Sequence, residues 1–279
     1  MRTFFALSFL AASALTAGAQ QPDFQWSKSE AAGTAVSVHN INGDVTILPG
    51  SGSTVSVTAH RTDGAGDDIY AVVREYADQV VVCVLWRDTD ESCDQDGAHM
   101  HSRNRQWRDR GQMDVTVHVP ATMTASVGTV SGDIRIQGAH GAVRATTVSG
   151  DLRLSDLDAT SVEATSVSGD VHVAIAAMSG SGGISARSVS GDLDVRVGAL
   201  AGTGDLTFRS VSGDVTITLP ASLNADFAMS TVSGELDTDF PLTLNGHVGR
   251  RSIDARIGTG GRQFKVSTVS GDVSLRAVK

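Results

Sequence analysis

A short motif, Val-Ser-Gly followed by an acid, recurs through the sequence at nearly regular spacing. Copies include TVSGDIRI, TTVSGDLRL, SVSGDVHV, SVSGDLDV, SVSGDVTI, TVSGELDT and TVSGDVSL, and NINGDVTI is a looser copy near the start. Successive VSG glycines are 18, 19, 22, 22, 21 and 37 residues apart, and the last gap is close to two periods. This period predicts the coils of a β-solenoid, because one short coil buries its apolar side chains only by stacking on its neighbours.

The segments around the motif alternate apolar and polar residues, as in VSVHNINGDVTI and DVTVHV. This alternation is typical of β-strands, and no mature segment carries a sustained helical stripe. A β-propeller would need about twice the period. We therefore predict an all-β chain: a single-stranded parallel β-helix or β-solenoid with about 18–22 residues per coil, preceded by an N-terminal β region with a long polar loop.

The segment SVEATSVSGDVHVAI illustrates one coil. Val162, Ala164 and Val167 are expected to point inward on one strand, and Val171, Val173 and Ile175 on the next. The corner between the strands is then Ser168-Gly169-Asp170. Glycine suits such a corner because it adopts positive φ without steric penalty. The predicted corner glycines are Gly43, Gly132, Gly150, Gly169, Gly191, Gly213, Gly234 and Gly271.

Stacking also predicts a ladder of carboxylates along one edge. Its members are Asp133, Asp151, Asp170, Asp192, Asp214 and Glu235. Two unit charges at the strand spacing of about 4.8 Å repel by about 0.9 kcal/mol in bulk water. Hydrogen bonds from backbone N–H groups or serine hydroxyls are the favoured compensation. Ca²⁺ ions that bridge successive coils are the alternative, although the glycine-rich calcium repeat GGxGxDxUx is absent. We expect no other cofactor.

The start of the chain resembles a secretory signal. Met1 and Arg2 precede an apolar run, and a small-x-small cleavage site ends at Ala19, so residues 1–19 are interpreted as a signal peptide. The run is too short to span a bilayer. Removal of Arg2 takes the formal net charge from −9 to −10, which argues against nucleic acid or an anionic membrane surface as the main partner. The mature chain is expected in a periplasm, at the cell surface or outside the cell.

Two cysteines, Cys83 and Cys93, are present in this exported chain. An oxidising compartment favours a disulfide between them over two free thiols. A metal site that adds His99 and His101 is a weaker alternative, because the paired spacing of structural zinc ligands is missing.

We divide the mature chain at residue 120. Residues 20–120 form the N-terminal β region with a polar loop at 87–112, and residues 121–279 form the repeat solenoid. Both parts are expected to share one sheet system, since no linker separates them. The segment GHVGRRSIDARIGTGGRQ, residues 246–263, interrupts the short spacing and is expected to add a coil or an edge hairpin. An edge hairpin would protect the last strand from polymerisation. Within it, GTGGR is interpreted as a turn.

Several of these features together resemble one family. The segment VVVCVLW with its later cysteine, the lead-in VHVPATM, the tandem repeats and the closing NGHVGRRSIDARIGTGGRQFKVSTVSGDVSL resemble the bacterial putative-adhesin domain family, roughly from Ser37 to Leu275. The resemblance implies a β-helix-like fold at the cell envelope. It brings no catalytic or ligand-binding residues.

The functional prediction is a non-enzymatic envelope or surface interaction scaffold whose partner is a protein or a polysaccharide. One alternative is a carbohydrate-active β-helix enzyme, which would need acids that converge at one non-repeating patch. Trp86 and Trp107 flank the polar loop and could stack on sugar or anchor the loop. A further alternative is an envelope protein that self-associates end to end.

Overall fold

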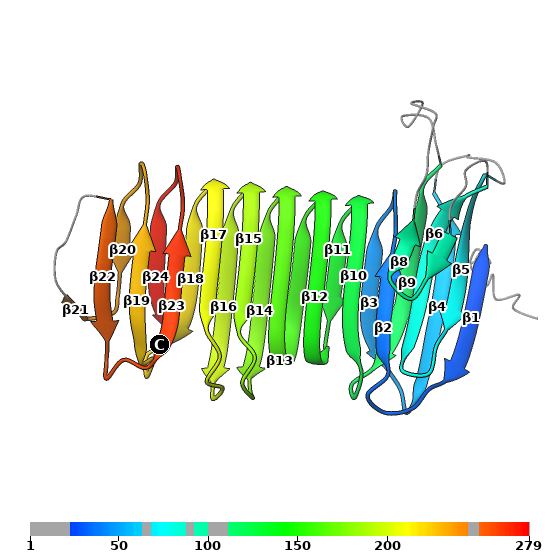
Figure 1. Ribbon diagram of the computed structural model, residues 1–279, viewed down its shortest axis with the longest axis horizontal. Coiled ribbons are helices and arrows are strands. Elements are labelled where there is room, and N and C mark those ends of the chain that lie inside the picture. Colours follow the sequence, from blue (N-terminus) through cyan, green and yellow to red (C-terminus); the bar gives the residue numbers. More distant parts are fainter. Residues whose placement is uncertain (1–22, 63–67, 88–91, 100–110, 245–250, 279) are drawn as a thin grey trace, which may run out of the picture.

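The computed structural model describes residues 23–62, 68–87, 92–99, 111–244 and 251–278 (Figure 1). Strands and turns make up all of these residues, and none of them belongs to a helix that could cross a bilayer. Two stacks of strands lie back to back around one apolar core that runs the length of the molecule. The prediction of an all-β solenoid is confirmed. The predicted signal, residues 1–19, lies outside the described residues.

Each regular coil contributes one strand to each stack. Stack 1 runs in the order β5 (Ile69–Glu75), β6 (Gln79–Trp86), β2 (Ala35–His39), β10 (Thr124–Ser131), β12 (His140–Ser149), the second half of β13 (Leu152–Ser168), β15 (Ile184–Ser190), β17 (Leu206–Ser212), β23 (Arg262–Ser267), β19 (Ala225–Ser230), β22 (Ser252–Ile257) and β21 (Leu242–Leu244). Stack 2 runs in the order β1 (Phe24–Ser29), β4 (Thr54–Arg61), β9 (Met113–Pro120), β3 (Val45–Gly50), β11 (Ile134–Gln137), the first half of β13, β14 (Val171–Met178), β16 (Leu193–Leu200), β18 (Val215–Pro220), β24 (Val273–Val278) and β20 (Leu236–Thr238).

The alternation of side chains explains the core, with one correction. Val162, Ala164, Val171, Val173 and Ile175 are buried as predicted. Val167 is instead 43% exposed, and its neighbour Ser166 is 1% exposed. The prediction for Val167 was wrong because the strict two-residue period continues to the end of the strand and turns Ser166 inward.

The solenoid begins earlier than residue 121. Strands β2 and β3 pair in parallel with β10 and β11, so they already form a coil. Beyond this coil, β6 and β9 continue the two stacks in parallel pairing, and antiparallel β5, β4 and β1 complete the N-terminal end. The hydrogen-bonded network is continuous across the predicted boundary at residue 120.

Part of the predicted polar loop forms a hairpin. Strands β7 (Ser92–Asp94) and β8 (Gly97–His99) pair in antiparallel orientation. Cys93 on β7 forms the predicted disulfide with Cys83 on β6, and the two Cα atoms are 6.0 Å apart. The disulfide joins the hairpin to a small outer cluster that includes Val81 and Leu85. Trp86 points the other way and packs in the main core, so it offers no sugar-stacking surface, and Trp107 lies outside the described residues.

The order of coils at the C-terminal end differs from their order in the sequence. Strands β23 and β24 lie between the coil of β17 and β18 and the coil of β19 and β20. The packing of three phenylalanine rings agrees with this order. The ring centroid of Phe264 lies 5.9 Å from that of Phe208 on one side and 5.0 Å from that of Phe227 on the other. The last repeat is therefore inserted between two earlier ones.

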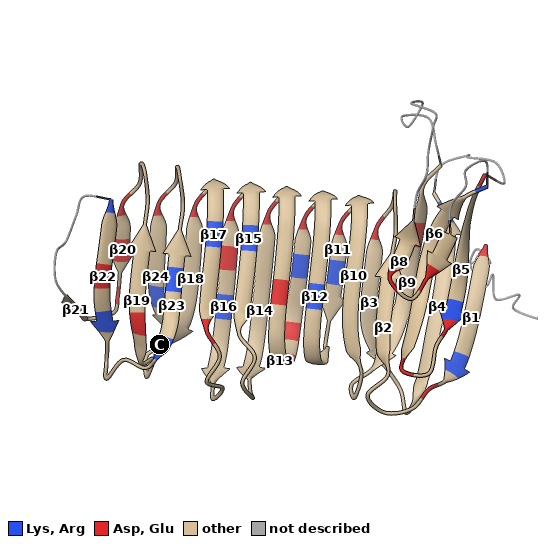
Figure 2. Cartoon of the chain, viewed as in Figure 1, with Lys and Arg blue, Asp and Glu red and all other residues tan. Residues whose placement is uncertain are grey.

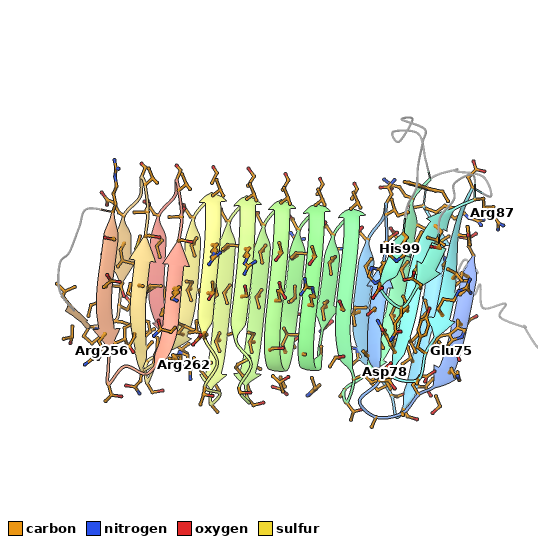
Figure 3. The ribbon with its side chains drawn as sticks, in the orientation of Figure 1. Glu75, Asp78, Arg87, His99, Arg256 and Arg262 are labelled. Atoms are coloured by element: carbon orange, nitrogen blue, oxygen red, sulfur yellow. A yellow bond between two sulfur atoms is a disulfide. The ribbon has the colours of Figure 1, made fainter. Side chains whose placement is uncertain are left out.

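The segment before the inserted coil closes the end of the solenoid. Strand β22 pairs antiparallel with β19, and β21 pairs antiparallel with β22, which is the expected protection of the end strand. GTGGR forms the turn from β22 into β23. Arg262, labelled in Figure 3, lies at the start of β23. Its guanidinium donates hydrogen bonds to the carbonyl oxygens of Gly202 and Gly204. This contact ties the inserted coil to the loop before β17.

Disulfide trapping tests the inserted order. Thr207 on β17 pairs in register with Lys265 on β23, and Lys265 with Ala228 on β19. Neighbouring parallel strands place Cα atoms about 4.8 Å apart, within disulfide range, whereas Thr207 and Ala228 are about 9.6 Å apart. Under mild oxidation we expect Thr207→Cys with Lys265→Cys to cross-link. The control pair Thr207→Cys with Ala228→Cys should stay reduced, and the opposite pattern in mass spectra would show sequential coils.

Candidate functional site

The corner glycines stack directly on one another. Seven of the eight predicted positions have φ between 124° and 148°, and Gly234 is the exception. A Cβ atom on Gly169 would lie within 3.0 Å of the carbonyl oxygen of Gly150, a separation that such atoms essentially never show. The same contact recurs from coil to coil. Glycine is thus required for its backbone conformation and for the close approach of the next coil.

A row of buried hydroxyls lies beside the glycines. Thr147, Ser166 and Ser188 donate to the glycine carbonyl oxygens of the preceding coils at 3.2–3.3 Å. Their equivalents around the inserted coil are Ser210, Thr268 and Thr231, which are buried and have no hydrogen-bond partner among the described residues. The regular corner is therefore fully satisfied, and the corner around the insertion is not.

Every aspartate of the ladder accepts a backbone hydrogen bond from the next coil. The N–H of Asp151 donates to Asp133 Oδ1 and the N–H of Asp170 donates to Asp151 Oδ1, both at 2.9 Å. Eight such bonds of 2.8–2.9 Å connect the coils. Figure 2 shows the acids in a row along one edge of the solenoid. The favoured explanation for the repeated acid thus has direct geometric support.

The ladder is longer than the sequence predicted, and its end is ordered differently. Asp114 and Asp44 precede Asp133, and Asp272 lies between Asp214 and Glu235. The expected step from Asp214 to Glu235 was wrong because of the inserted coil. Glu235 donates its N–H to Asp272 and ends the row. An acid at this end has no following Asp N–H to accept, so the shorter side chain is not required there.

Arginines neutralise the N-terminal part of the ladder. Arg135 contacts Asp44 and Asp133 at 2.9 Å each, and Arg153 contacts Asp151 at 2.9 Å. The hydrogen bond to Asp44 is the largest cause of the raised pKa of Arg135. The later acids make no ion pair within the described ranges; they are Asp170, Asp192, Asp214, Asp272 and Glu235. Among the described residues, ion pairs therefore compensate the ladder charge at Asp44, Asp133 and Asp151.

The same arginines border a furrow on the outer face of stack 2. The furrow has a volume of about 430 Å³ and crosses β3, β11, β13, β14 and β16. Its polar lining consists of Arg135, Arg153, His172, Arg196, Gln137, Ser155, Thr46 and Asp194. Register pairing places Arg135, Arg153 and His172 in one row, one residue per coil. The same row continues into Asp194, so the furrow presents cations, neutral hydrogen-bonding groups and one carboxylate along the solenoid axis, on a shallow open surface.

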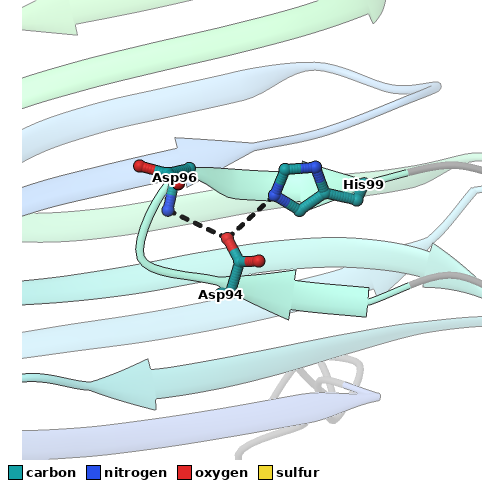
Figure 4. Close-up of side chains that lie close together, drawn as sticks. All are labelled: Asp94, Asp96 and His99. Atoms are coloured by element: carbon teal, nitrogen blue, oxygen red, sulfur yellow. Dashed lines mark hydrogen bonds and ion pairs between the residues drawn. The ribbon is translucent and has the colours of Figure 1, made fainter.

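A second group of polar side chains lies on the hairpin. Asp94 Oδ1 accepts the N–H of Asp96 and lies 2.9 Å from His99 Nε2 (Figure 4). The bond from His99 is the main reason that the pKa of Asp94 is lowered. All three residues are exposed, and hydrogen bonds within the hairpin account for their grouping. The alternative metal site would use Cys83 and Cys93 as ligands, but both form the disulfide. His101, another of its expected ligands, lies outside the described residues.

Substitution of Asp170 separates the hydrogen bond from the charge. Asp170 accepts the N–H of Asp192 and makes no ion pair among the described residues. Asp170→Ala leaves that N–H without its acceptor, and we expect a loss of about 1–3 kcal/mol in the free energy of unfolding. Asp170→Asn keeps an acceptor oxygen and removes one charge, so its stability should equal or exceed that of the wild type at low salt. Chemical denaturation measures both, and equal destabilisation of the two variants would contradict the hydrogen-bond role.

The calcium alternative has a separate measurement. Since each ladder Oδ1 already accepts an N–H, we expect a chelator to leave the melting temperature unchanged. A fall in the melting temperature with chelator that is reversed by Ca²⁺ would instead assign cations to the ladder.

Comparison with known proteins identifies the family. Residues 109–276 match the Toastrack DUF4097 family, a narrower range than the expected Ser37 to Leu275. No match was found among curated proteins. Solved structures similar to the chain include a putative adhesin from Bacteroides fragilis (13% identity, TM-score 0.41, covering 92% of this chain and 100% of that one). Others are a putative cell adhesion protein from Clostridium sporogenes (10%, 0.37, 92% and 100%) and a putative adhesin from Parabacteroides merdae (10%, 0.35, 92% and 96%).

These structural likenesses are too distant to carry an argument about function. The family match covers more than half of the chain and includes every VSG repeat from Gly132 onward. It agrees with the resemblance inferred from the repeats, and the chain belongs to the Toastrack DUF4097 family.

Proposed function

We propose that the protein is exported and acts as a non-enzymatic interaction scaffold at the cell envelope, where its outer faces bind an extended partner. The stack 2 furrow is the observation that carries this proposal. Arg135, Arg153 and His172 stand in one row, and Gln137 and Ser155 stand in the next. Rows that repeat with the coil suit a polymer, which is held by several weak contacts rather than by one deep pocket.

The chemistry of the furrow favours an acidic polysaccharide. Guanidinium groups pair with carboxylates in bidentate geometry, and amide and hydroxyl groups bond sugar hydroxyls. Arg196 is the most exposed of the furrow cations, with 67% of its side chain accessible. The partner must compete with Asp194, which lies 3.3 Å from Arg196, and with the ladder acids that Arg135 and Arg153 contact at 2.9 Å. Ion pairs that are this exposed to solvent are weak enough to exchange.

The use of the acids supports a scaffold over a glycosidase. A glycosidase needs two carboxyl groups with distinct environments facing one sugar. Along the corner, Asp170, Asp192 and Asp214 share one environment, since each accepts the N–H of the following coil and makes no ion pair among the described residues. The row therefore distributes equivalent acids and gives no single pair a separate role.

Export has its own test. We expect the chain expressed from its full sequence in a bacterial host to accumulate outside the cytoplasm and to begin at Gln20, because cleavage is predicted after Ala19. Cell fractionation followed by N-terminal sequencing measures this. A cytoplasmic chain that retains residues 1–19 would contradict the proposal.

Binding is tested with an acidic polysaccharide of known composition. We expect the mature protein to retain polygalacturonate on an affinity matrix and to bind the neutral polymer dextran weakly or not at all. Arg153→Gln combined with Arg196→Gln should lower the affinity by about tenfold or more, because two charge-assisted contacts are lost. The control Arg276→Gln removes a paired cation from the same stack, outside the furrow.

The outcomes separate clearly. Loss of binding in the furrow variant alone supports the furrow as the binding surface. Equal losses in the furrow and control variants would show nonspecific charge attraction. No retention of polygalacturonate by the wild type would overturn the assignment of an acidic polysaccharide.

A further inference from the structure

A second furrow, on the opposite outer face, has a different chemistry. It has a volume of about 470 Å³ and crosses β15, β17, β23 and β19 of stack 1. One wall is a row of valines, and the other wall begins with two arginines: Val189, Val211, Val269, Val232, Arg187 and Arg209. Serine and threonine complete its lining, and the described lining contains no carboxylate. The furrow is therefore apolar on one side and cationic on the other.

The valine wall belongs to an exposed row that runs along the whole repeat. Seven valines that precede the corner serines are 39–58% exposed. The equivalent residue of the first coil, Ile41, is only 3% exposed. Corner geometry does not need an apolar side chain at this outward position, because the contacts between coils are made by the glycine, the hydroxyl and the acid. An uncovered apolar row of this length is characteristic of a binding surface.

Two arginines of the furrow stand side by side without a partner among the described residues. Arg187 and Arg209 are in register on neighbouring strands, about 4.8 Å apart along the stack. Neither guanidinium has an ion-pair or hydrogen-bond partner in the described part of the chain, whereas Arg144 on the same face pairs with Glu163. Two unpaired cations at this spacing repel each other, and an anion placed between them would remove the repulsion.

The dimensions of the furrow limit what it can hold. Side chains two residues apart on a strand are about 6.8 Å apart, so the space between the arginine and valine rows admits one extended chain. An α-helix, about 10 Å wide, is too broad. A β-strand along the axis would repeat its side chains about every 6.8 Å, out of step with valines about 4.8 Å apart. An unbranched alkyl chain has no such register and needs no hydrogen bonds.

We propose that this furrow binds a single-chain anionic amphiphile, with its alkyl chain along the valine row and its anionic head between Arg187 and Arg209. A long-chain fatty acid is the simplest such ligand. Its carboxylate lies between β15 and β17, and its chain runs past Val269 toward Val232 on β19, about 12 Å farther along the stack. The site is independent of the stack 2 furrow and of the polymer proposed to bind there.

Calorimetry with laurate below its micelle concentration tests the site on the mature protein. We expect saturable binding of one laurate per chain, weakened by salt, with acetate and the neutral detergent dodecyl maltoside binding far more weakly. Arg187→Gln combined with Arg209→Gln should lower the affinity by about tenfold or more. Val211→Thr combined with Val269→Thr keeps the shape of the valine wall and should lower the affinity several-fold.

Matched controls lie on the same face. Arg144→Gln removes a cation outside the furrow, and Val148→Thr changes the same corner position in an earlier coil. Both should bind laurate as the wild type does, and thermal unfolding confirms that each variant folds. Absence of laurate binding would overturn the proposal. It would also be overturned if acetate bound equally well, or if the control variants lost as much affinity as the furrow variants.

Discussion

The carbonyl oxygen of each corner glycine occupies the space that a side chain on the next corner glycine would need. This contact fixes how one coil sits on another. Once it is made, the following N–H points at the acid of the preceding coil and bonds it at 2.8–2.9 Å. Coils of 18 and 22 residues can then stack with identical corners, because the extra residues lie at the opposite edge, as in the connections 179–183 and 201–205.

The same contacts explain how a repeat can be inserted out of order. Coils with the same corner structure can stack on one another in any order. The corner sequence of a coil therefore does not determine which coil lies next to it. At the C-terminal end the choice is made by side chains outside the corner, where Phe264 packs between Phe208 and Phe227. The insertion leaves the buried hydroxyls of Ser210, Thr268 and Thr231 without a hydrogen-bond partner among the described residues, whereas the equivalent hydroxyl of Ser166 in a regular coil donates to a glycine carbonyl oxygen. Glu235 then lies at the end of the ladder, where no following ladder N–H among the described residues needs an aspartate as its acceptor.

Much of this arrangement could be predicted from the sequence because it is periodic. The alternation of strands, the corner glycines and the acid ladder repeat, and Val171 and Val173 face inward as the period requires. Val167 could not be placed by hydrophobicity, since its buried neighbour Ser166 is held inward by a hydrogen bond to Gly150. The position of the last coil depends on contacts between residues 58 apart, which no local pattern records. The two furrows likewise arise from the register between strands of neighbouring coils.

The residues that distinguish one coil from another lie outside the corner, where side chains take no part in the contacts between coils. The row two residues before the exposed valines is Thr146, Thr165, Arg187 and Arg209 in successive coils, so it changes from neutral to cationic while the corner stays constant. On the other stack, Arg153 and His172 give way to Asp194 over the same interval. Stability requires neither change, because backbone pairing and the core are the same in these coils. A uniform scaffold thus carries local differences in charge on both faces, and those differences, rather than the repeated acid, are where a partner would be distinguished.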